Sequence, residues 1–197
     1  MNTIALLGIA TYFLAAIPFA LVVSKLKGID LRSIGSGNLG ATNVVRGMGW
    51  GFGVLVLGLD ALKGYLPVMY ALNSFESPWI HVGIGALAIA SHSLSVFVKF
   101  KGGKGAATGL GVLLALSPDV FLIVFSVAVI AIGVTRYVAP TTIFCAFITP
   151  ILLYVREYPT PYIIVLGTIC FFIIVRHHSN IKRVFQGKEN KVEHLKK

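Results

Sequence analysis

Long runs of apolar residues, separated by short polar or proline-containing breaks, dominate this chain. An α-helix needs about 20 apolar residues to cross the hydrocarbon core of a bilayer, and a shorter run can serve as a short or re-entrant pass. The pattern therefore predicts an all-α, polytopic integral membrane helix bundle, with seven transmembrane helices as the favoured count. The runs cover about residues 4–23, 50–72, 79–98, 105–117, 119–135, 138–155 and 161–175.

Two of these runs leave the count open. The fourth is short, and Pro118 and Pro140 each stand where a helix restarts rather than continues. Runs four and five could therefore merge, or one could be re-entrant, which makes five or six spans the alternative. The first run lacks the basic start and the small-residue cleavage site of a signal peptide, so we interpret it as a membrane span.

The composition supports a membrane protein. Hydrophobic residues make up 56% of the 197 residues and charged residues 12%, against about 25% charged residues in a soluble domain. Together with a mean hydropathy of +0.86, this excludes disorder and a soluble fold, and the length fits a single integral membrane domain over 1–197. Cys145 and Cys170 both lie in apolar runs, which favours packed thiols over a disulfide or a metal site.

The positive charges predict the orientation of the chain. If the runs alternate across the membrane and segment 24–49 is cytoplasmic, every Lys and Arg except Lys63 and Arg156 falls on the cytoplasmic side. This is the positive-inside pattern, and it places the N-terminus outside and the C-terminus inside. The formal net charge of +10 is then mainly a topology signal, with some attraction to anionic headgroups or phosphate substrates. Nucleic acid is not needed to explain it.

Three cytoplasmic segments carry candidate chemistry: 24–49, 99–108 and 176–197. In the first, Gly35, Gly37 and Gly40 form a literal G-x-G-x-x-G, but a dinucleotide site also needs a preceding strand and a βαβ unit. Closely spaced glycines before a helix still let backbone amides converge on an anion. Further hydrogen-bonding groups come from Ser36, Asn38, Thr42, Asn43 and Arg46. The alternative is an ordinary turn between two helices.

In the second segment, Lys104 lies between Gly103 and Gly105 at the start of a helix, in the run Gly102 to Thr108. The spacing does not fit a Walker A loop, because Gly105 stands where the magnesium-binding hydroxyl would be. A lysine among glycines at a helix start still favours phosphate binding. A plain positive-inside loop is the alternative. It accounts for Lys99 and Lys101, but it leaves the glycines unexplained.

The third segment begins just after the last span. His177 and Asn180 are three residues apart, so a continuing helix places both on one face. The pair His177-His178 has no Cys or acidic ligand at metal-binding spacing, so we expect no metal. Asp60 and Lys63 are charged residues inside the second run, and we favour a structural ion pair over a functional role.

The three segments together resemble the bacterial acyl-phosphate:glycerol-3-phosphate acyltransferases over nearly the whole chain. Ser36 to Arg46 resembles the first motif of that family, Phe100 to Thr108 the second, and His177 through Asn180 to Glu189 the third. Two residues depart from the family pattern. Ser95 stands where proline is common, and Ser91 stands where glycine usually precedes the histidine, here His92.

The resemblance implies transfer of a fatty acyl group from acyl phosphate to the 1-hydroxyl of glycerol 3-phosphate, giving lysophosphatidic acid and inorganic phosphate in phospholipid synthesis. It implies a multi-pass protein of the bacterial inner membrane with a cytoplasmic active site and no cofactor. Its partners would be the two substrates and membrane lipids, while the oligomeric state stays open.

The residues allow a division of roles. An acyl phosphate is already activated, so no protein nucleophile is needed, and Ser36 and Asn38 are expected at the donor's phosphate and carbonyl. Arg46, Lys104, His177 and Asn180 are expected at glycerol 3-phosphate and the departing phosphate. His177 or a substrate phosphate oxygen would accept the proton, and Glu189 would anchor the tail. The expected substrate-binding residues are Ser36, Gly37, Asn38, Gly40, Thr42, Asn43, Arg46, Gly102, Gly103, Lys104, Gly105, Thr108, His177 and Asn180, and the expected catalytic residues are Ser36, Arg46, Lys104 and His177.

Two other classes of protein are alternatives to this prediction. A small transporter or channel for an organic phosphate or anion would also use intramembrane charges and glycine breaks, but it places them near the midplane, often in inverted repeats. Here the polar groups cluster on one side and no repeat is visible. A membrane phosphatase would need a nucleophile or metal constellation that the sequence does not offer.

Overall fold

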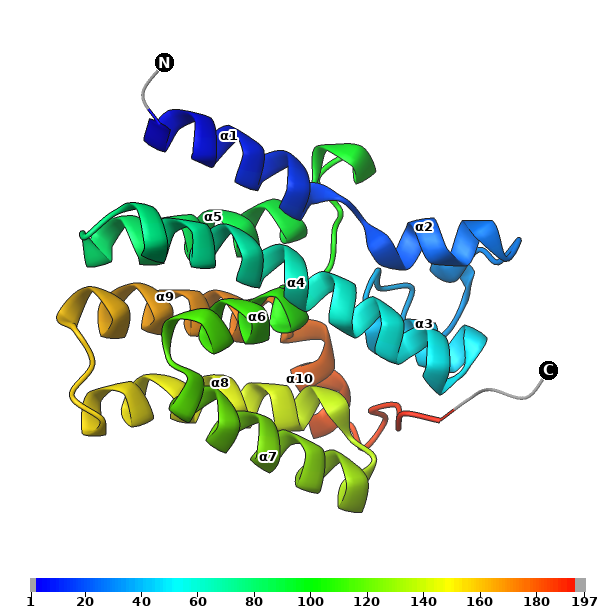
Figure 1. The fold of residues 1–197 in the computed structure, drawn as a ribbon. Coiled ribbons are helices and arrows are strands. Elements are labelled where there is room, and N and C mark those ends of the chain that lie inside the picture. Colours follow the sequence, from blue (N-terminus) through cyan, green and yellow to red (C-terminus); the bar gives the residue numbers. More distant parts are fainter. Residues whose placement is uncertain (1–2, 194–197) are drawn as a thin grey trace.

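The computed structural model describes residues 3–193, and every regular element in that range is helical (Figure 1). Two single-turn 3-10 helices, η1 (Leu31–Ser33) and η2 (Val96–Val98), lie in the connections. The α-helices are α1 (Thr3–Ala16), α2 (Phe19–Leu26), α3 (Ala41–Met48), α4 (Trp50–Ser74), α5 (Pro78–Ser93), α6 (Ala106–Leu116), α7 (Pro118–Thr135), α8 (Val138–Val155), α9 (Thr160–Arg176) and α10 (His178–Phe185).

The described helices supply four to six candidate membrane spans. Four segments pass by length and hydropathy: α4, α5 extended to Val98, α7 and α8. Two bent pairs pass only if each pair counts as one span: α1 with α2, bent by 40°, and α9 with α10, bent by 55°. The first bend lies at Pro18, since proline lacks the N–H needed to continue the helix. The all-helical membrane bundle is therefore confirmed.

The seven-span count is not confirmed, because the fourth run forms the short helix α6. Its 11 residues reach about 16 Å, roughly half the thickness of the hydrocarbon core. α6 and α7 are nevertheless separate helices, because the backbone leaves helical geometry at Ser117 (φ −151°, ψ 77°) and Pro118 starts α7. In Figure 1, α6 lies alongside the long helices and runs antiparallel to α7.

Close contact with α4 fixes α6 in the bundle. Gly64 on α4 faces the backbone of Thr108, and Gly111 on α6 faces the backbone carbonyl of Ala61, leaving no room for a side chain at either glycine. Small residues allow such close approach between membrane helices. α7 lies at the periphery of the described chain, with Leu122 61% and Ile130 67% exposed, as expected for a helix that faces lipid.

The short helices α2 and α3 lie on the right in Figure 1, and α10 follows the end of α9 nearer the middle of the view, with the C-terminal segment running from it towards the right. A small apolar cluster that includes Leu31, Leu39, Val44 and Val56 supports the polar stretch there. This part of the molecule therefore carries the first and third of the segments singled out in the sequence.

Candidate active site

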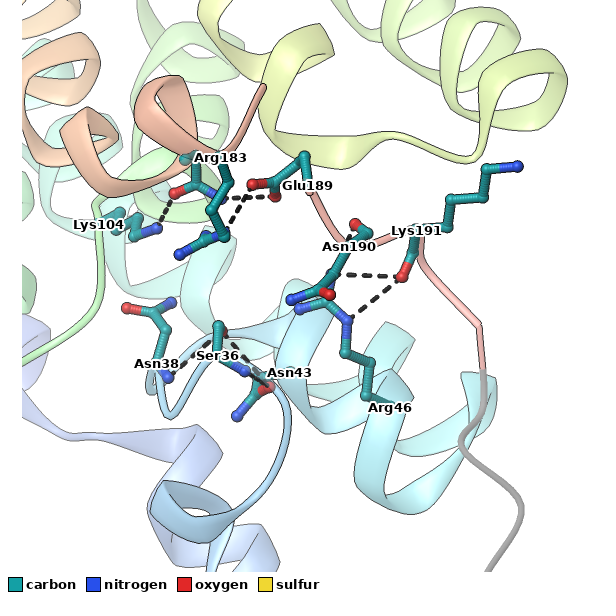
Figure 2. A network of polar contacts seen from close by, with 10 residues as sticks. Ser36, Asn38, Asn43, Arg46, Lys104, Arg183, Glu189, Asn190 and Lys191 are labelled. Carbon is teal, nitrogen blue, oxygen red and sulfur yellow. Dashed lines mark hydrogen bonds and ion pairs between the residues drawn. The ribbon is translucent and has the colours of Figure 1, made fainter. Parts of the chain in front are cut away.

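Asn43 folds the glycine-rich loop that precedes α3. Its side-chain amide donates to the carbonyls of Leu31 and Ile34 at 2.9 Å each. Its Oδ1 accepts from the amide of Ser36 at 3.1 Å (Figure 2). The loop needs glycine at position 35, where φ is +54° and a Cβ would lie 2.6 Å from Asn43 Oδ1. Asn43 thus holds Ser36 at the end of the bundle.

The second segment packs tightly on α5 before α6 begins. Gly102 and Gly103 lie directly against His92, with no space for a side chain at either glycine. The guanidinium of Arg176 donates to the carbonyl of Gly103 at 3.1 Å. This packing fixes the backbone next to Lys104, whose Nζ donates a hydrogen bond to Oδ1 of Asn180.

His177 and Asn180 come from the turn between α9 and α10 and from α10 itself. Nδ1 of His177 lies 2.7 Å from the carbonyl of Ile173. A carbonyl oxygen can only accept, so Nδ1 carries the hydrogen and Nε2 of the neutral ring is left as an acceptor. The amide of Asn180 donates to Oε1 of Glu189 at 2.7 Å, and Nε of Arg183 donates to Oε2 of the same carboxylate at 2.9 Å (Figure 2).

Arg46 on α3 binds the C-terminal segment through its guanidinium. Its Nη2 donates to the carbonyl of Asn190 at 3.0 Å, and Nε and Nη2 both reach the carbonyl of Lys191 at 3.3 Å. The amide of Val192 donates to the carbonyl of Arg136 at 2.8 Å, which ties the same segment to the α7–α8 connection. Burial lowers the pKa of Arg46, while the nearby Glu189 carboxylate opposes this shift.

A cavity of about 420 Å³ opens among these residues. Its polar end carries Arg46 and Lys104, and its walls continue along apolar side chains of α4, α7 and α8. The residues singled out in the sequence that line it are Ser36, Asn38, Gly40, Thr42, Asn43, Arg46, Asp60, Lys104, Gly105, His177, Asn180 and Glu189. Gly37, Lys63, Gly102, Gly103 and Thr108 lie outside the lining. Thr108, which is fully buried, faces Gly64 on α4 instead.

The surroundings of Lys104 at the polar end of the cavity lower its pKa. Burial lowers the pKa of its ammonium group to about 8, the positive charge of Arg183 adds to this effect, and Glu189 opposes it. A lysine in this state switches between the charged and the neutral form just above neutral pH. It is held among hydrogen-bonding groups, and a phosphate oxygen would favour the charged form.

Asp60, Lys63 and His92 form a second polar group within the bundle. Nζ of Lys63 lies 2.8 Å from Oδ1 of Asp60 and donates to the carbonyl of Ile17 at 2.7 Å. Nδ1 of His92 lies 3.8 Å from the same Asp60 oxygen. Asp60 and His92 also line the cavity, so the ion pair borders the candidate site.

Sequence reasoning missed three features of this site. In the sequence, Arg183 is one of several cations of the basic tail, and the carbonyls of Asn190 and Lys191 carry no signal in the side-chain pattern. His92 had no assigned role. The available signal was a histidine ten residues before the Gly102-Gly103 pair, but the sequence does not show that its ring packs on those glycines. Among residues 3–193, no three His, Cys, Asp or Glu side chains group as a metal site would require.

Comparisons with known proteins agree over most of the chain. The family model described as glycerol-3-phosphate acyltransferase matches residues 5–187. A glycerol-3-phosphate acyltransferase of Aquifex aeolicus is 42% identical over 184 residues, covering 93% of this chain and 96% of its own. One of Trichlorobacter lovleyi is 41% identical over 180 residues, covering 91% and 93%.

Solved structures give the same picture. The crystal structure of PlsY (YgiH), an integral membrane glycerol 3-phosphate acyltransferase, in its glycerol 3-phosphate form matches with a TM-score of 0.93 at 41% identity and covers 96% of both chains. Its lysophosphatidic acid form matches with a TM-score of 0.91 at 40% identity, covering 96% of this chain and 95% of the other.

Proposed function

This chain belongs to the glycerol-3-phosphate acyltransferase family, and we propose that its cavity transfers a fatty acyl group from acyl phosphate to the 1-hydroxyl of glycerol 3-phosphate. The products are lysophosphatidic acid and inorganic phosphate. The observation that carries the proposal is one cavity with Arg46 and Lys104 at its polar end and apolar walls beyond them. Such a cavity suits substrates that combine a phosphate with a fatty chain.

The proposed step needs no covalent intermediate with the protein. The 1-hydroxyl oxygen of glycerol 3-phosphate attacks the carbonyl carbon of the acyl phosphate, and the bond from that carbon to the phosphate oxygen breaks. The hydroxyl proton passes to Nε2 of His177 or to a substrate phosphate oxygen. The hydrogen bond from Nδ1 of His177 to Ile173 supports the first route, because it leaves Nε2 free to accept.

The binding groups divide between the two substrates. We assign Ser36 and Asn38 to the phosphate and carbonyl of the donor, since the glycine-rich loop presents both to the cavity. We assign Arg46, Lys104, His177 and Asn180 to glycerol 3-phosphate and to the charge that develops on the departing phosphate. Catalysis then rests on proximity and on fixed positive charge.

We also propose the membrane arrangement: seven passes, N-terminus outside, C-terminus inside, and an active site that faces the cytoplasm across a bacterial inner membrane. The charge distribution along the chain supports this orientation. It places every Lys and Arg except Lys63 and Arg156 on the cytoplasmic side. In this arrangement α6 is a short pass, preceded by the glycine-rich segment that carries Lys104.

The experiment is an assay of purified protein with acyl phosphate, following phosphate release and lysophosphatidic acid with and without glycerol 3-phosphate. We expect both products only when both substrates are present, and undiminished activity after treatment with a chelator. A strict requirement for a thioester donor or a divalent metal would contradict the proposal. The grouping of the polar residues at one end of the cavity does not favour the transporter alternative.

A further inference from the structure

A second, smaller cavity of about 90 Å³ lies deeper in the bundle, among α5 to α9. We call it the deep chamber. Along α6 its lining runs from Ala106, two residues after Lys104, to Leu113, a rise of about 10 Å. Along α9 it runs from Ile173 to Leu166, over the same number of residues. The deep chamber therefore extends from the level of the polar groups towards the middle of the bundle.

The deep chamber adjoins the active-site cavity. Four residues line both: Ala106, Leu110, Ala128 and Thr142. They come from α6, α7 and α8, so the two spaces meet along a common wall instead of lying on opposite sides of the bundle. The deep chamber therefore lies directly beside the active-site cavity.

The deep chamber offers almost nothing to a polar ligand. Its threonines are already bonded within their own helix: Oγ1 of Thr142 donates to Val138 at 2.9 Å and Oγ1 of Thr149 to Cys145 at 2.7 Å. The thiol of Cys145 donates to the carbonyl of Val124 at 3.7 Å. A buried water needs two or more free polar partners, so an apolar occupant fits better.

The active-site cavity also opens towards the bilayer, so a fatty acyl chain has two alternative paths. Val54, Phe125 and Val129 line that cavity and are 60%, 38% and 54% exposed, so a chain lying along them meets lipid and has no upper length. The deep chamber is bounded by buried residues such as Leu113, Leu166 and Ile169. A chain that enters it therefore contacts mainly buried protein side chains.

We propose that the deep chamber receives the distal methylenes of the fatty acyl chain and so sets the longest chain that the enzyme transfers well. The proposal rests on the proposed function, because it assumes an acyl donor in the adjoining cavity. Contacts between the deep chamber and the distal methylenes stabilise the bound substrate and the transition state equally. They therefore change the selectivity between chain lengths and leave the rate of the chemical step unchanged.

The test is a competition between a shorter and a longer saturated acyl phosphate, of roughly twelve and sixteen carbons, with both lysophosphatidic acids measured together. The product ratio is independent of how much enzyme is folded. Gly109→Ala adds a methyl group to the chamber, 3.3 Å from Cδ1 of Ile173, and we expect the long-to-short ratio to fall about fourfold per methylene displaced. Ala146→Leu should lower it further, and Ile169→Ala should raise it.

Gly83→Ala is the matched control, since a Cβ at Gly83 meets nothing within 4 Å and the change also replaces a helical glycine. Its ratio should equal that of the wild type. Unchanged ratios in Gly109→Ala and Ala146→Leu would overturn the inference and leave the exposed route as the path of the chain. A wild-type enzyme that makes neither product from acyl phosphate would instead overturn the proposed function.

Discussion

Lys104 donates a hydrogen bond to the side-chain oxygen of Asn180, which lies 76 residues later in the sequence. The amide group of the same asparagine donates to Glu189, so both ends of the Asn180 side chain are held. A fixed asparagine fixes the ammonium group that bonds to it. The lysine is therefore aimed at the polar end of the cavity before any substrate arrives.

Replacing Lys104 should cost far more activity than replacing Lys101. Lys104→Ala removes the proposed charge-assisted contact to phosphate, worth roughly 1.5–3 kcal/mol, on the order of 10- to 100-fold, and more if the contact tightens in the transition state. Lys101 is exposed and lies outside the cavity lining, so Lys101→Ala should be much milder. Steady-state kinetics of the two purified variants check this. Equal activities would reduce Lys104 to a topology signal.

The activity should decline as the pH rises through about 8. In the proposed site, phosphate is bound by the ammonium form of Lys104, which is populated below that pKa and lost above it. We expect kcat/KM for glycerol 3-phosphate to fall up to tenfold per pH unit on the alkaline side. In Lys104→Arg the charge persists to pH 12 or so, which should remove this decline. The same decline in both enzymes, after correction for uncatalysed hydrolysis, would assign it to another group.

Removing one partner of the buried pair Asp60 and Lys63 should destabilise the protein more than removing both. Each side chain is at most 2% exposed, so Asp60→Asn or Lys63→Met leaves an unpaired buried charge at a cost of about 3–5 kcal/mol. The double variant should unfold at a higher temperature than either single variant in detergent. If the pair is purely structural, the folded double variant keeps its activity. A double variant that folds but is inactive would show that Asp60 has a functional role in the cavity that it lines.

The orientation can be measured with single cysteines in intact cells. We expect cysteines at Ser33 and Gln186 to resist an impermeant thiol reagent and a cysteine at Glu76, in the exposed α4–α5 connection, to react. The native Cys145 and Cys170 are buried and give a low background. Labelling at position 33 or 186 with protection at 76 would reverse the orientation.

Much of the fold could be predicted from the sequence, because hydropathy records where a helix meets lipid. The apolar runs match the long helices within a few residues, and Pro118 marks a real helix start. Hydropathy alone does not determine whether the chain has seven spans. Whether the short run before Pro118 crosses the membrane depends on its packing against Gly64 and Ala61 of α4, which the run itself does not encode.

The candidate site was predictable where local pattern decides the structure. The glycines around Ser36 and Lys104 indicated two phosphate-binding loops, and both loops border the cavity. The contacts that join the segments were not predictable. Arg46 binds backbone carbonyls, which every residue carries, so the amino-acid sequence does not identify Asn190 and Lys191 as its partners. Arg183 likewise becomes distinct from other tail cations only through Glu189.

The hold of Arg46 on residues 190 and 191 has a consequence for folding. The partners are 144 and 145 residues apart in the sequence, so this contact closes a loop that contains most of the chain. Closing so long a loop costs conformational entropy that the packing of the intervening helices must offset. We therefore expect the contact to form late in folding, after the helices between its two ends have packed.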